Sequence, residues 1–343
     1  MSTIKDVALL AGVSFTTVSH VLNQTRPVSA DARRRVLAAV DKLGYVPSAV
    51  ARSLRKSETG IVGVLVPTVQ NPFFAELVCG AEEVCRQAGY SVFLCNSDND
   101  ARRQQHYLRT LLEKRIDGLL VASVGEPEAF DRVLVSSGLP CVAMDRLMPG
   151  EQADRISLDN RAGAELATRH LLELGHRHIA CISGPEAVEV SQARVLGWRE
   201  ALQAGQVEPG SHWLQVSDFS TAGGYQAAMA LLRVPARPSA IFACNDLMAL
   251  GVLRAAAELG LLVPAELSVM GFDNIELGGF VHPALSTVGC SIRTLGREAG
   301  RLLIDRIEKP AQALRHVQLS PQLVARESCA VVRARRTRKE GVQ

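Results

Sequence analysis

The first 45 residues contain three stretches in which apolar residues recur at the three- and four-residue spacing of an amphipathic helix. The first stretch begins at Thr3, which can cap it, and ends at Gly12. The second begins after Ser14, and the third covers Ala30–Leu43, with Gly44 as its stop. Two short helices joined by a turn that contains glycine, with a third helix to complete a small core, have the layout of a helix-turn-helix.

Beyond residue 60, short runs of β-branched residues alternate with stretches of helical periodicity. The predicted strands cover residues 61–66, 91–96, 119–121, 141–144, 179–183, 240–243 and 268–270, with another near 213–216. The predicted helices cover residues 74–88, 101–114, 162–174, 192–204 and 246–259. This alternation predicts parallel, doubly wound sheets, and about 270 residues are too many for one such sheet. We therefore expect an α/β core of two lobes behind an all-α headpiece.

Composition excludes several classes of protein. The 343 residues are 47% hydrophobic, yet no run of 18 uncharged apolar residues occurs, so no membrane-spanning segment is expected. The start of the chain lacks the layout of a secretory signal, which predicts a cytoplasmic protein and argues against a transport binding protein. The eight cysteines form no C-x-x-C pair and no zinc spacing, which favours buried free thiols in a reducing compartment.

Sequence motifs of enzymes and metal sites are missing as well. The chain contains no phosphate loop, no G-x-G-x-x-G, no G-x-S-x-G and no H-E-x-x-H, which weighs against a doubly wound enzyme. The run of His170, His176 and His178 has the pattern of a helix stop that enters a strand rather than that of a metal site. We therefore expect neither a metal nor a cofactor.

Charge is distributed unevenly along the chain. Residues 1–60 contain nine Lys and Arg against four Asp and Glu, whereas residues 61–332 contain 24 against 30. The net charge of +3 for the whole chain therefore hides a basic N-terminal end. This asymmetry predicts that contact with nucleic acid is confined to the N-terminus. The basic tail after residue 332 is expected to be disordered and solvated, and it carries no leucine heptads for a coiled coil.

The second predicted helix carries polar groups suited to DNA. Its apolar face leaves out Phe15, Thr16, Thr17, Ser19 and His20. Small hydroxyls and an imidazole can approach base edges in the major groove, and a helix N-terminus can hold phosphate. The alternative is that a start rich in serine and threonine is only a helix cap.

The segment after the third helix predicts a short helix of seven residues that Ser48 can cap. A helix of this length is marginal in water, so we expect it to order only when something holds it. Leu54, flanked by Arg52 and Arg55, then becomes an exposed apolar residue in a basic setting. This pattern fits a wedge inserted between base steps in the minor groove. The alternative is that Leu54 packs on its own domain.

Polar and aromatic side chains follow the predicted strands of the core, where open α/β sheets bind their ligands. They are Asn71, Phe73, Phe74, Asp145, Arg146, Arg194, Phe219, Asn245 and Asp273. Carboxylates, guanidinium groups and amides can satisfy sugar hydroxyls in pairs, and phenyl rings can pack on the C–H faces of a sugar. Each residue also has an ordinary explanation, such as a turn, a cap or a core position. Their common placement at strand ends nevertheless predicts a sugar-binding cleft.

The N-terminal motifs resemble those of a known family. The segments Thr3-Ile-Lys-Asp-Val-Ala, Gly12-Val-Ser, Thr17-Val-Ser-His-Val-Leu-Asn23 and Leu43-Gly-Tyr-Val-Pro-Ser-Ala-Val-Ala-Arg-Ser-Leu54 are similar to the headpiece of lactose-repressor/galactose-repressor transcription factors. The resemblance implies that the second helix reads the major groove and that the hinge leucine opens a minor-groove step. The DNA contacts that we expect are Thr3, Phe15, Thr16, Thr17, Ser19, His20, Asn23, Ser48, Arg52, Leu54 and Arg55. Phe15 departs from the small polar residue of the family pattern.

Residues 61–330 resemble the sugar-binding core that these repressors share with bacterial periplasmic sugar-binding proteins. The spacing of Asn71-Pro-Phe-Phe74, Asp145-Arg146, Arg194, Phe219, Asn245-Asp246 and Gly271-Phe-Asp273 follows that of ribose repressors. Cys290, expected in the effector site, stands where the family pattern has glutamine, which can admit a different pentose or a hexose. Val188 and Val190 stand where purine-sensing relatives carry polar residues, which disfavours a purine.

These observations combine into one expected organisation. We expect a helix-turn-helix domain at 1–47, a hinge helix and linker at 48–60, an effector-binding and dimerisation domain at 61–330, and the tail at 331–343. Lobe 1 is expected at about 61–158 and 291–320, and lobe 2 at about 159–289 and 321–330. The expected function is a homodimeric repressor of a sugar-utilisation operon, bound to a palindromic operator and controlled by a ribose-like pentose. A purine or phosphorylated effector, or an enzyme of the same fold, are the alternatives, and the direction of the effector response stays open.

Overall fold

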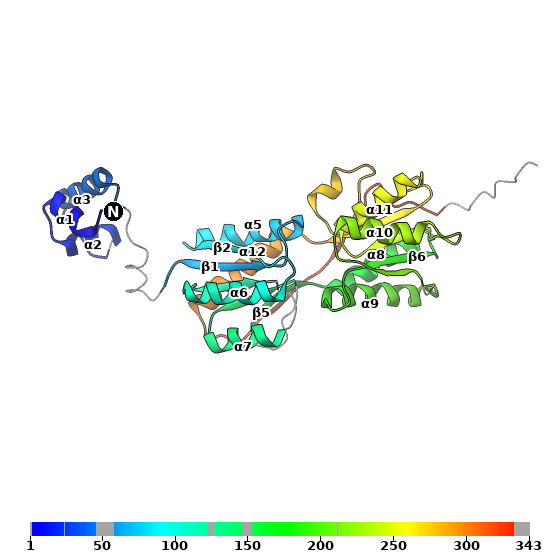
Figure 1. Cartoon of the computed structure of the whole chain (residues 1–343), viewed down its shortest axis with the longest axis horizontal. Helices are drawn as coiled ribbons and strands as arrows, with labels where there is room; N and C mark the ends of the chain where they lie inside the picture. The colour runs from blue at the N-terminus through cyan, green and yellow to red at the C-terminus, as the bar shows by residue number, and fades with distance from the viewer. Residues whose placement is uncertain are drawn as a thin grey trace, which may run out of the picture. The chain divides into compact units, whose positions relative to one another are not determined.

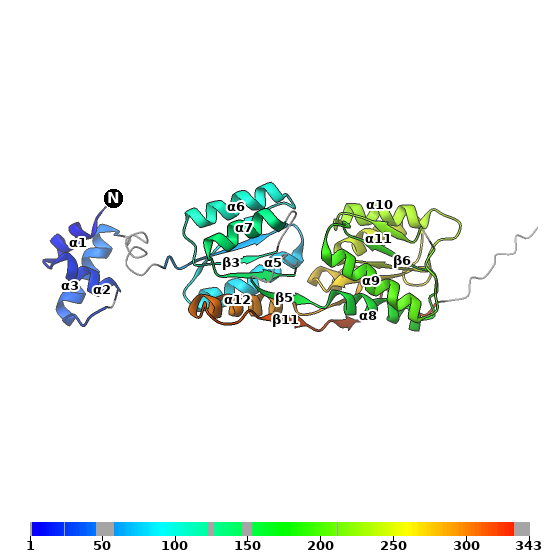
Figure 2. The ribbon, with the colours of Figure 1, turned by 90° about the horizontal axis from the view of Figure 1, so that it is seen from below.

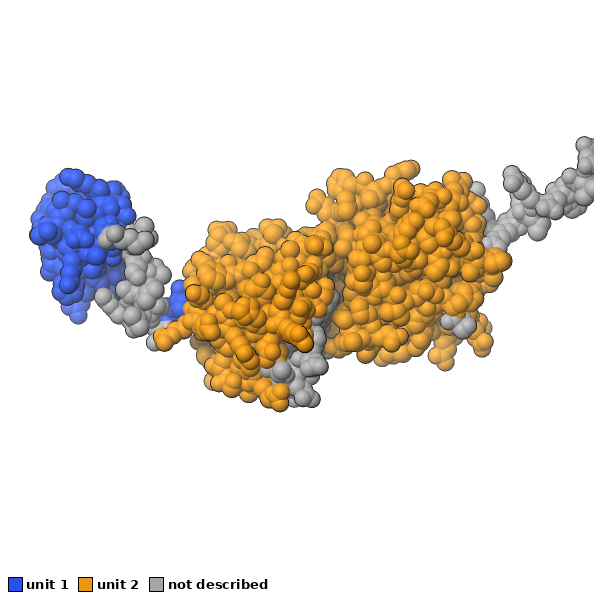
Figure 3. All heavy atoms as spheres, viewed as in Figure 1, with its two compact units in different colours: residues 1–59 blue, residues 60–343 orange. Residues whose placement is uncertain are grey.

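The computed structural model describes residues 2–23, 25–45, 58–122, 127–145, 153–210 and 212–332. Two compact units, residues 1–59 and 60–343, make up the chain (Figure 3). The regular elements described in the first are all helices, and the second contains two parallel-sheet lobes with helices on both faces of each sheet (Figure 1). The predicted classes of both parts are confirmed.

The described residues of the first unit form three helices, α1 (Ile4–Ala11), α2 (Phe15–Asn23) and α3 (Ala30–Leu43). Thr3 caps α1 through a reciprocal capping box with Asp6. The Ser14 hydroxyl oxygen accepts a hydrogen bond of 3.1 Å from the Thr17 N–H at the start of α2. Glycines with left-handed φ end α1 and α3, as their positions in the sequence predict. Apolar side chains from all three helices then meet in one small core.

Lobe 1 contains a six-stranded sheet in the order β11-β5-β4-β3-β1-β2. Its strands are β1 (Ile61–Val66), β2 (Ser91–Asn96), β3 (Gly118–Val121), β4 (Cys141–Met144), β5 (Asp154–Leu158) and β11 (His316–Leu319). Helices α5 (Pro72–Gln87) and α12 (Ile292–Glu308) cover one face, and α6 (Ala101–Glu113) and α7 (Pro127–Ser137) cover the other (Figures 1 and 2). All pairings in this sheet are parallel.

Lobe 2 repeats this plan with the strand order β12-β10-β9-β8-β6-β7. Its strands are β6 (Ile179–Ser183), β7 (Leu214–Val216), β8 (Ala240–Ala243), β9 (Ser268–Asp273), β10 (Ser286–Gly289) and the antiparallel β12 (Gln322–Val324). The helix pairs are α8 (Asn160–Glu173) with α9 (Glu189–Ala204), and α10 (Thr221–Leu232) with α11 (Asp246–Glu258). A short 3-10 helix, η1 (Glu276–Gly279), follows β9.

The chain passes between the lobes at three places in the described residues. These are the connections from β5 to α8, from β10 to α12 and from β11 to β12. Each lobe is therefore built from segments that lie far apart in the sequence. As a result, the carboxyl ends of both parallel sheets border the space between the lobes.

Glycines allow the two covering helices of lobe 1 to pack with their backbones in close approach. A Cβ atom added at Gly296 of α12 would lie 2.1 Å from the carbonyl oxygen of Leu77 in α5. At Gly300, one turn further along α12, the nearest atoms to such a Cβ lie at 3.1 Å. Only glycine fits at Gly296 without moving the helices apart, because the obstacle is backbone.

We expect Gly296→Ala to lower the free energy of unfolding of the second unit by about 1–3 kcal/mol, since overpacking outweighs the gain in helix propensity. Gly300→Ala is the matched control on the same helix and is expected to lower the free energy of unfolding by a smaller amount. Urea unfolding of both variants measures the difference. Equal stabilities of the two variants would contradict the close backbone contact.

Candidate functional site

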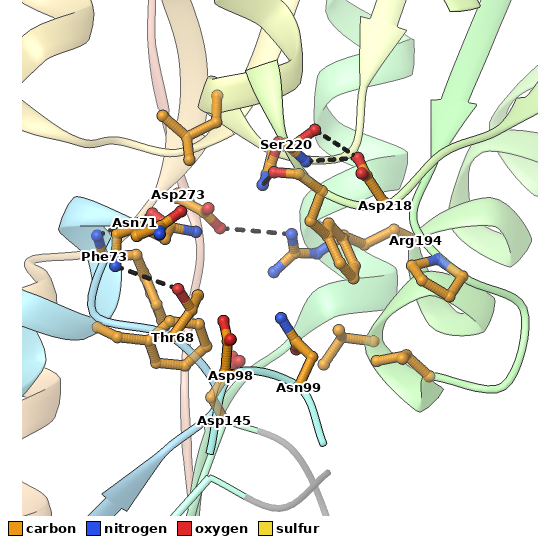
Figure 4. Close-up of a pocket in the computed structure, with 18 of the residues that line it drawn as sticks. Thr68, Asn71, Phe73, Asp98, Asn99, Asp145, Arg194, Asp218, Ser220 and Asp273 are labelled. Carbon is orange, nitrogen blue, oxygen red and sulfur yellow. Dashed lines mark hydrogen bonds and ion pairs between the residues drawn. The ribbon is translucent and has the colours of Figure 1, made fainter. Parts of the chain in front are cut away.

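A cavity of about 490 Å³ lies between the two lobes, at the carboxyl ends of their strands (Figure 4). Eight of the side chains predicted for effector binding line it: Asn71, Phe73, Phe74, Asp145, Arg194, Phe219, Asn245 and Asp273. Arg146 lies outside the described residues. The placement of these eight around one cavity is the arrangement that the strand-end pattern predicts.

Cys290 does not line this cavity, so the structure differs from the prediction at this position. It follows β10 and packs, partly buried, against the apolar clusters of both lobes. Burial, together with the nearby carboxylates of Asp145 and Asp273, raises the pKa of the Cys290 thiol to about 11. Cys290 therefore packs between the apolar clusters of the two lobes and is not among the residues that line the cavity.

Four neighbouring groups hold the Arg194 side chain in the floor of the cavity. Its side chain is only 4% exposed, and its guanidinium lies 3.3 Å from the carboxylate of Asp273. The Nε atom donates to Asn160 Oδ1 at 2.8 Å, and Nη1 donates to the carbonyl of Cys244. The same group stacks on the Phe272 ring, with 3.8 Å to the ring centroid. A cation buried so deeply requires these partners, and they hold its remaining N–H groups in one orientation.

Asp273 ends β9 in a conformation that few residues adopt. Its φ is 107°, and the next residue, Asn274, has a φ of 61°. Burial raises the pKa of Asp273 well above its ordinary value, while the Arg194 guanidinium opposes that shift. Backbone strain and a desolvated carboxylate at one position are typical of a binding site that its surroundings hold in place.

The two asparagines of the cavity each cap a helix. Asn71 Oδ1 accepts a hydrogen bond of 3.0 Å from the Phe73 N–H at the start of α5. Asn245 Oδ1 accepts from the Met248 N–H at 2.8 Å, and its Nδ2 donates to the Phe219 carbonyl at 3.0 Å. The ordinary explanation of a cap is therefore correct for both residues, and both still face the cavity.

Three phenyl rings supply the apolar surfaces of the cavity. Phe73 and Phe74 meet edge to face, with ring centroids 5.1 Å apart. Phe219 has a left-handed φ of 67° and packs its ring against Gly184, where a Cβ would overlap the ring. The rings thus come from both lobes, and they can hold the flat face of a small ligand.

Further lining residues follow the strands but were not among those predicted. The polar ones are Thr68, Gln70, Asp98, Asn99, Asp218 and Ser220, and the apolar ones are Pro185, Ala187, Val188, Val190 and Leu247. Asp98 and Asn99 come directly after the predicted strand 91–96, so the same strand-end rule could have found them. Asp218 accepts hydrogen bonds from Ser220, chiefly from its hydroxyl, and these lower the pKa of that carboxyl (Figure 4).

The electrostatic character of the described lining is acidic. Four carboxylates face the cavity, those of Asp98, Asp145, Asp218 and Asp273, against the single guanidinium of Arg194, which is already paired. Such a lining repels phosphate and carboxylate groups, and it accepts hydrogen bonds from hydroxyl or amino groups.

Below the cavity lies a second buried carboxylate, Asp246, at the start of α11. It accepts hydrogen bonds from the Thr287 hydroxyl at 2.6 Å and from the Ile275 N–H at 2.8 Å. Asp246 therefore ties together β10, α11 and the turn that follows Asp273. Burial raises the pKa of this carboxyl to about 7, although both hydrogen bonds favour its charged form.

The first unit presents most of the predicted DNA contacts on and around α2. Thr16 is exposed, Phe15 is 59% exposed, and His20 is half-buried with its Nδ1 hydrogen-bonded to the Thr25 hydroxyl at 2.8 Å. Thr17 shares a hydrogen bond with the Ser14 hydroxyl, and Thr3 is occupied as the cap of α1.

The expectation that Ser19 lies off the apolar face of α2 is wrong. Ser19 is 5% exposed, and its hydroxyl and carbonyl accept hydrogen bonds from the Asn23 side chain. The residue directly follows Val18 on the helix and turns toward the same core. The other predicted DNA contacts, Ser48, Arg52, Leu54 and Arg55, lie outside the described residues.

The described residues contain no cluster of three potential metal ligands, and none of their helices could cross a membrane. His176 is buried and hydrogen-bonded to the hydroxyls of Ser239 and Ser268. All eight cysteines are free, but Cys79 is exposed, so the expectation of buried thiols fails at that position.

Comparison with known proteins places the chain in a family. Residues 3–48 match the model of bacterial regulatory proteins of the lacI family, and residues 168–329 match that of the periplasmic binding protein-like domain. The HTH-type transcriptional repressor PurR of Photobacterium profundum is 40% identical over 329 residues, which cover 96% of this chain and 98% of that protein. The ribose operon repressor of Haemophilus influenzae is 40% identical over 328 residues, with the same two shares. The chain belongs to the lacI family.

Solved structures agree with this assignment. The Lac repressor dimer bound to operator and the anti-inducer ONPF has a TM-score of 0.86 and 30% identity, covering 96% of this chain and 99% of that one. A LacI family regulator from Enterococcus faecium with bound ribose has a TM-score of 0.73 and 32% identity, covering 80% and 100%. The protein is thus a DNA-binding repressor of this family, with a helix-turn-helix headpiece and a periplasmic-binding-protein-like core.

The raised pKa of Asp246 predicts a pH-dependent stability. Between the ordinary value of 3.8 and about 7, the folded protein keeps a proton that the unfolded chain releases, so its stability falls as the pH rises through this window. Asp246→Asn removes the titrating carboxyl and, with it, this pH-dependent contribution to stability. The stability of the wild type relative to Asp246→Asn should therefore fall by up to about 1.4 kcal/mol per pH unit in the window and level off above it.

Denaturant unfolding at pH 5, 6, 7 and 8, followed by the fluorescence of the two tryptophans, measures this difference. A difference that rises with pH, or that does not change, would contradict a neutral buried Asp246.

Proposed function

We propose that this repressor controls a sugar-utilisation operon and that a ribose-like pentose bound between the two lobes sets its operator affinity. The observation that carries the proposal is the lining of the cavity, with carboxylates, amides and one fixed guanidinium beside three phenyl rings. A free sugar is uncharged, presents hydroxyls that donate and accept, and has flat C–H faces. A site built to pair such hydroxyls rejects analogues that lack them.

Two of the comparisons support a pentose as the effector. The Haemophilus influenzae relative is named a ribose operon repressor, and the Enterococcus faecium structure holds ribose. A purine is the second candidate, because several relatives of about 40% identity are named PurR. Against a purine stand Val188 and Val190, which give the cavity an apolar wall. The family resemblance implies that those two positions are polar in purine-sensing members.

A phosphorylated effector fits the described lining poorly. Its phosphate would face four carboxylates, and the one guanidinium is already engaged by Asp273. Arg103 and Arg194 pair with two of these carboxylates, those of Asp98 and Asp273, and the acidic charge that remains favours a neutral ligand.

On the DNA side, we propose that two copies of the chain place one α2 helix each in the half-sites of a palindromic operator. Thr16, Thr17 and His20 are the side chains of α2 that we assign to the base edges, with Phe15 beside them. Leu54, between Arg52 and Arg55, is assigned as the minor-groove wedge. Acting on DNA in this way places the protein in the cytoplasm.

The effector assignment predicts the outcome of a calorimetric panel. D-ribose should bind, whereas ribose 5-phosphate, hypoxanthine and guanine should bind at least about tenfold more weakly, given the acidic lining and the apolar wall. Asp145→Asn keeps the shape of the side chain but loses its charge and part of its acceptor capacity. It should weaken ribose binding about tenfold or more.

Asp41→Asn, in the exposed part of α3, is the control for this substitution and should leave ribose binding unchanged. Tight binding of a purine, with no heat from ribose, would transfer the effector role to the purine and overturn the pentose.

The assignment of Leu54 as a wedge predicts that its substitution lowers the affinity for DNA and leaves the affinity for the effector unchanged. Leu54→Ala should weaken binding to the specific operator about tenfold or more, because the kinked step loses its apolar filling. Ribose affinity should not change. Leu9→Ala, at an exposed leucine of the same unit, is the matched control and should retain operator affinity. Fluorescence anisotropy with a labelled operator measures the operator affinity of the wild type and of both variants. An unchanged affinity of Leu54→Ala would refute the wedge.

A further inference from the structure

Lobe 2 contains a second cavity, of about 400 Å³, which is separate from the effector cleft. It lies between helix α9 and strand β7, and the loop 184–188, which leads into α9, forms one end of it. The cleft between the lobes lies against the other side of this loop and of the first turn of α9, where Ala187, Val188 and Val190 line it. The volume falls in the range of about 300–1,000 Å³ that small-molecule sites occupy.

The walls of this second cavity are mainly apolar. Ser191, Val195 and Arg199 occupy positions four residues apart on α9, so their side chains form one row along the helix. Leu214 and Val216 face them from β7, where alternate residues point to the same side. Because β7 is the edge strand of its sheet, this side of the sheet is less covered there, and Val216 remains 50% exposed.

One buried hydroxyl in this cavity has no partner. Ser191 is 1% exposed, and its Oγ makes no hydrogen bond within the described residues. Buried polar groups are rarely left unpaired, because they have lost their hydrogen bonds to water. A ligand atom that donates or accepts would satisfy this hydroxyl.

The charges in the cavity are separated along its length. Arg199 lines one end, where it makes no ion pair with any described residue, and its row on α9 places it about 12 Å from Ser191. Glu186 lines the other end, beside the loop, where its carbonyl accepts from the Gln192 side chain at 2.7 Å. An anionic group is therefore favoured at Arg199 and disfavoured near Glu186.

We propose that this cavity is a second ligand site, which takes a small organic anion with an apolar body. Arg199 holds the anionic group, Val195, Leu214 and Val216 pack on the body, and the hydroxyl of Ser191 pairs with a polar atom at the far end. The site uses none of the side chains of the effector cleft. A ligand at this site would be additional to the proposed function, and binding to the site can be measured without the effector.

The position of the site gives it a connection to the effector cleft. Gly184 lines the second cavity, and the Phe219 ring of the effector cleft packs directly on it. Ser191, in the second cavity, is three residues before Arg194 on the same helix. A ligand here contacts the segment that carries both Arg194 and the apolar wall of the cleft, which is where a second signal could alter effector binding.

Anilinonaphthalene sulfonate, an apolar ring system with one anionic group, is a suitable probe for titration of the full-length protein. Its emission when tryptophan is excited reports binding near lobe 2, because the two tryptophans, Trp198 and Trp213, lie on α9 and directly before β7. We expect Arg199→Gln to weaken binding about fivefold. Val216→Glu, which places a like charge against the probe, should weaken it about tenfold.

Matched controls are available in lobe 1. Arg109→Gln changes an exposed arginine of α6, and Val135→Glu changes a valine of α7 that is 49% exposed, nearly the same as Val216. Both controls should bind the probe with wild-type affinity. The proposal is overturned if the probe does not bind, or if neither Arg199→Gln nor Val216→Glu binds it more weakly than its control. Thermal unfolding of the four variants verifies that each is folded.

Discussion

The buried ion pair between Arg194 and Asp273 is the interaction on which the effector cleft depends. Both side chains are almost fully buried, and charges so far from water are tolerated only when they are paired and hydrogen-bonded. Arg194 meets this condition through Asp273, Asn160 and the Cys244 carbonyl, which belong to three different elements. The pair therefore fixes the start of α9 against β8 and β9, and it defines the floor on which a ligand rests.

A second buried carboxylate, that of Asp246, stabilises the turn that contains Asp273. Asp246 accepts hydrogen bonds from Thr287 and Ile275, so it joins β10 to the turn in which Asp273 has its unusual φ of 107°. Burial raises the pKa of Asp273 and of Asp246 for the same physical reason, the loss of water around a charge. The cleft is thus held by polar interactions that are costly to bury and that can be satisfied only in one arrangement.

The fold could be predicted from the sequence wherever apolar periodicity was strong, and less well where buried polar residues interrupt it. Strands 61–66, 91–96 and 179–183 have the predicted bounds. The pattern assigned no element to β5, because it contains Asp154, whose buried carboxylate is satisfied by the bidentate pair with Arg306 in α12 and by the Arg315 N–H. A partner 152 residues away cannot be read from local periodicity.

The same limit applies to the site. The strand-end rule found residues such as Asp145 and Asn245, because the carboxyl edge of a parallel sheet is fixed by topology. Two predictions made on other grounds failed, Ser19 from the polar face of the second helix and Cys290 from the family resemblance, because the burial of both depends on how neighbouring side chains pack. The strand-end rule also did not include Val188, Asp218 and Ser220, which lie in the loops after β6 and β7.

We propose that binding in the cleft and binding of operator by the headpiece are coupled. If ribose is the effector, as we propose, thermodynamic linkage requires that ribose and operator change each other's affinity by the same factor. The most direct test is to measure operator affinity across a series of D-ribose concentrations, and ribose affinity with and without operator. We predict two equal factors that differ clearly from one. An operator affinity that stays constant at saturating ribose would contradict the account.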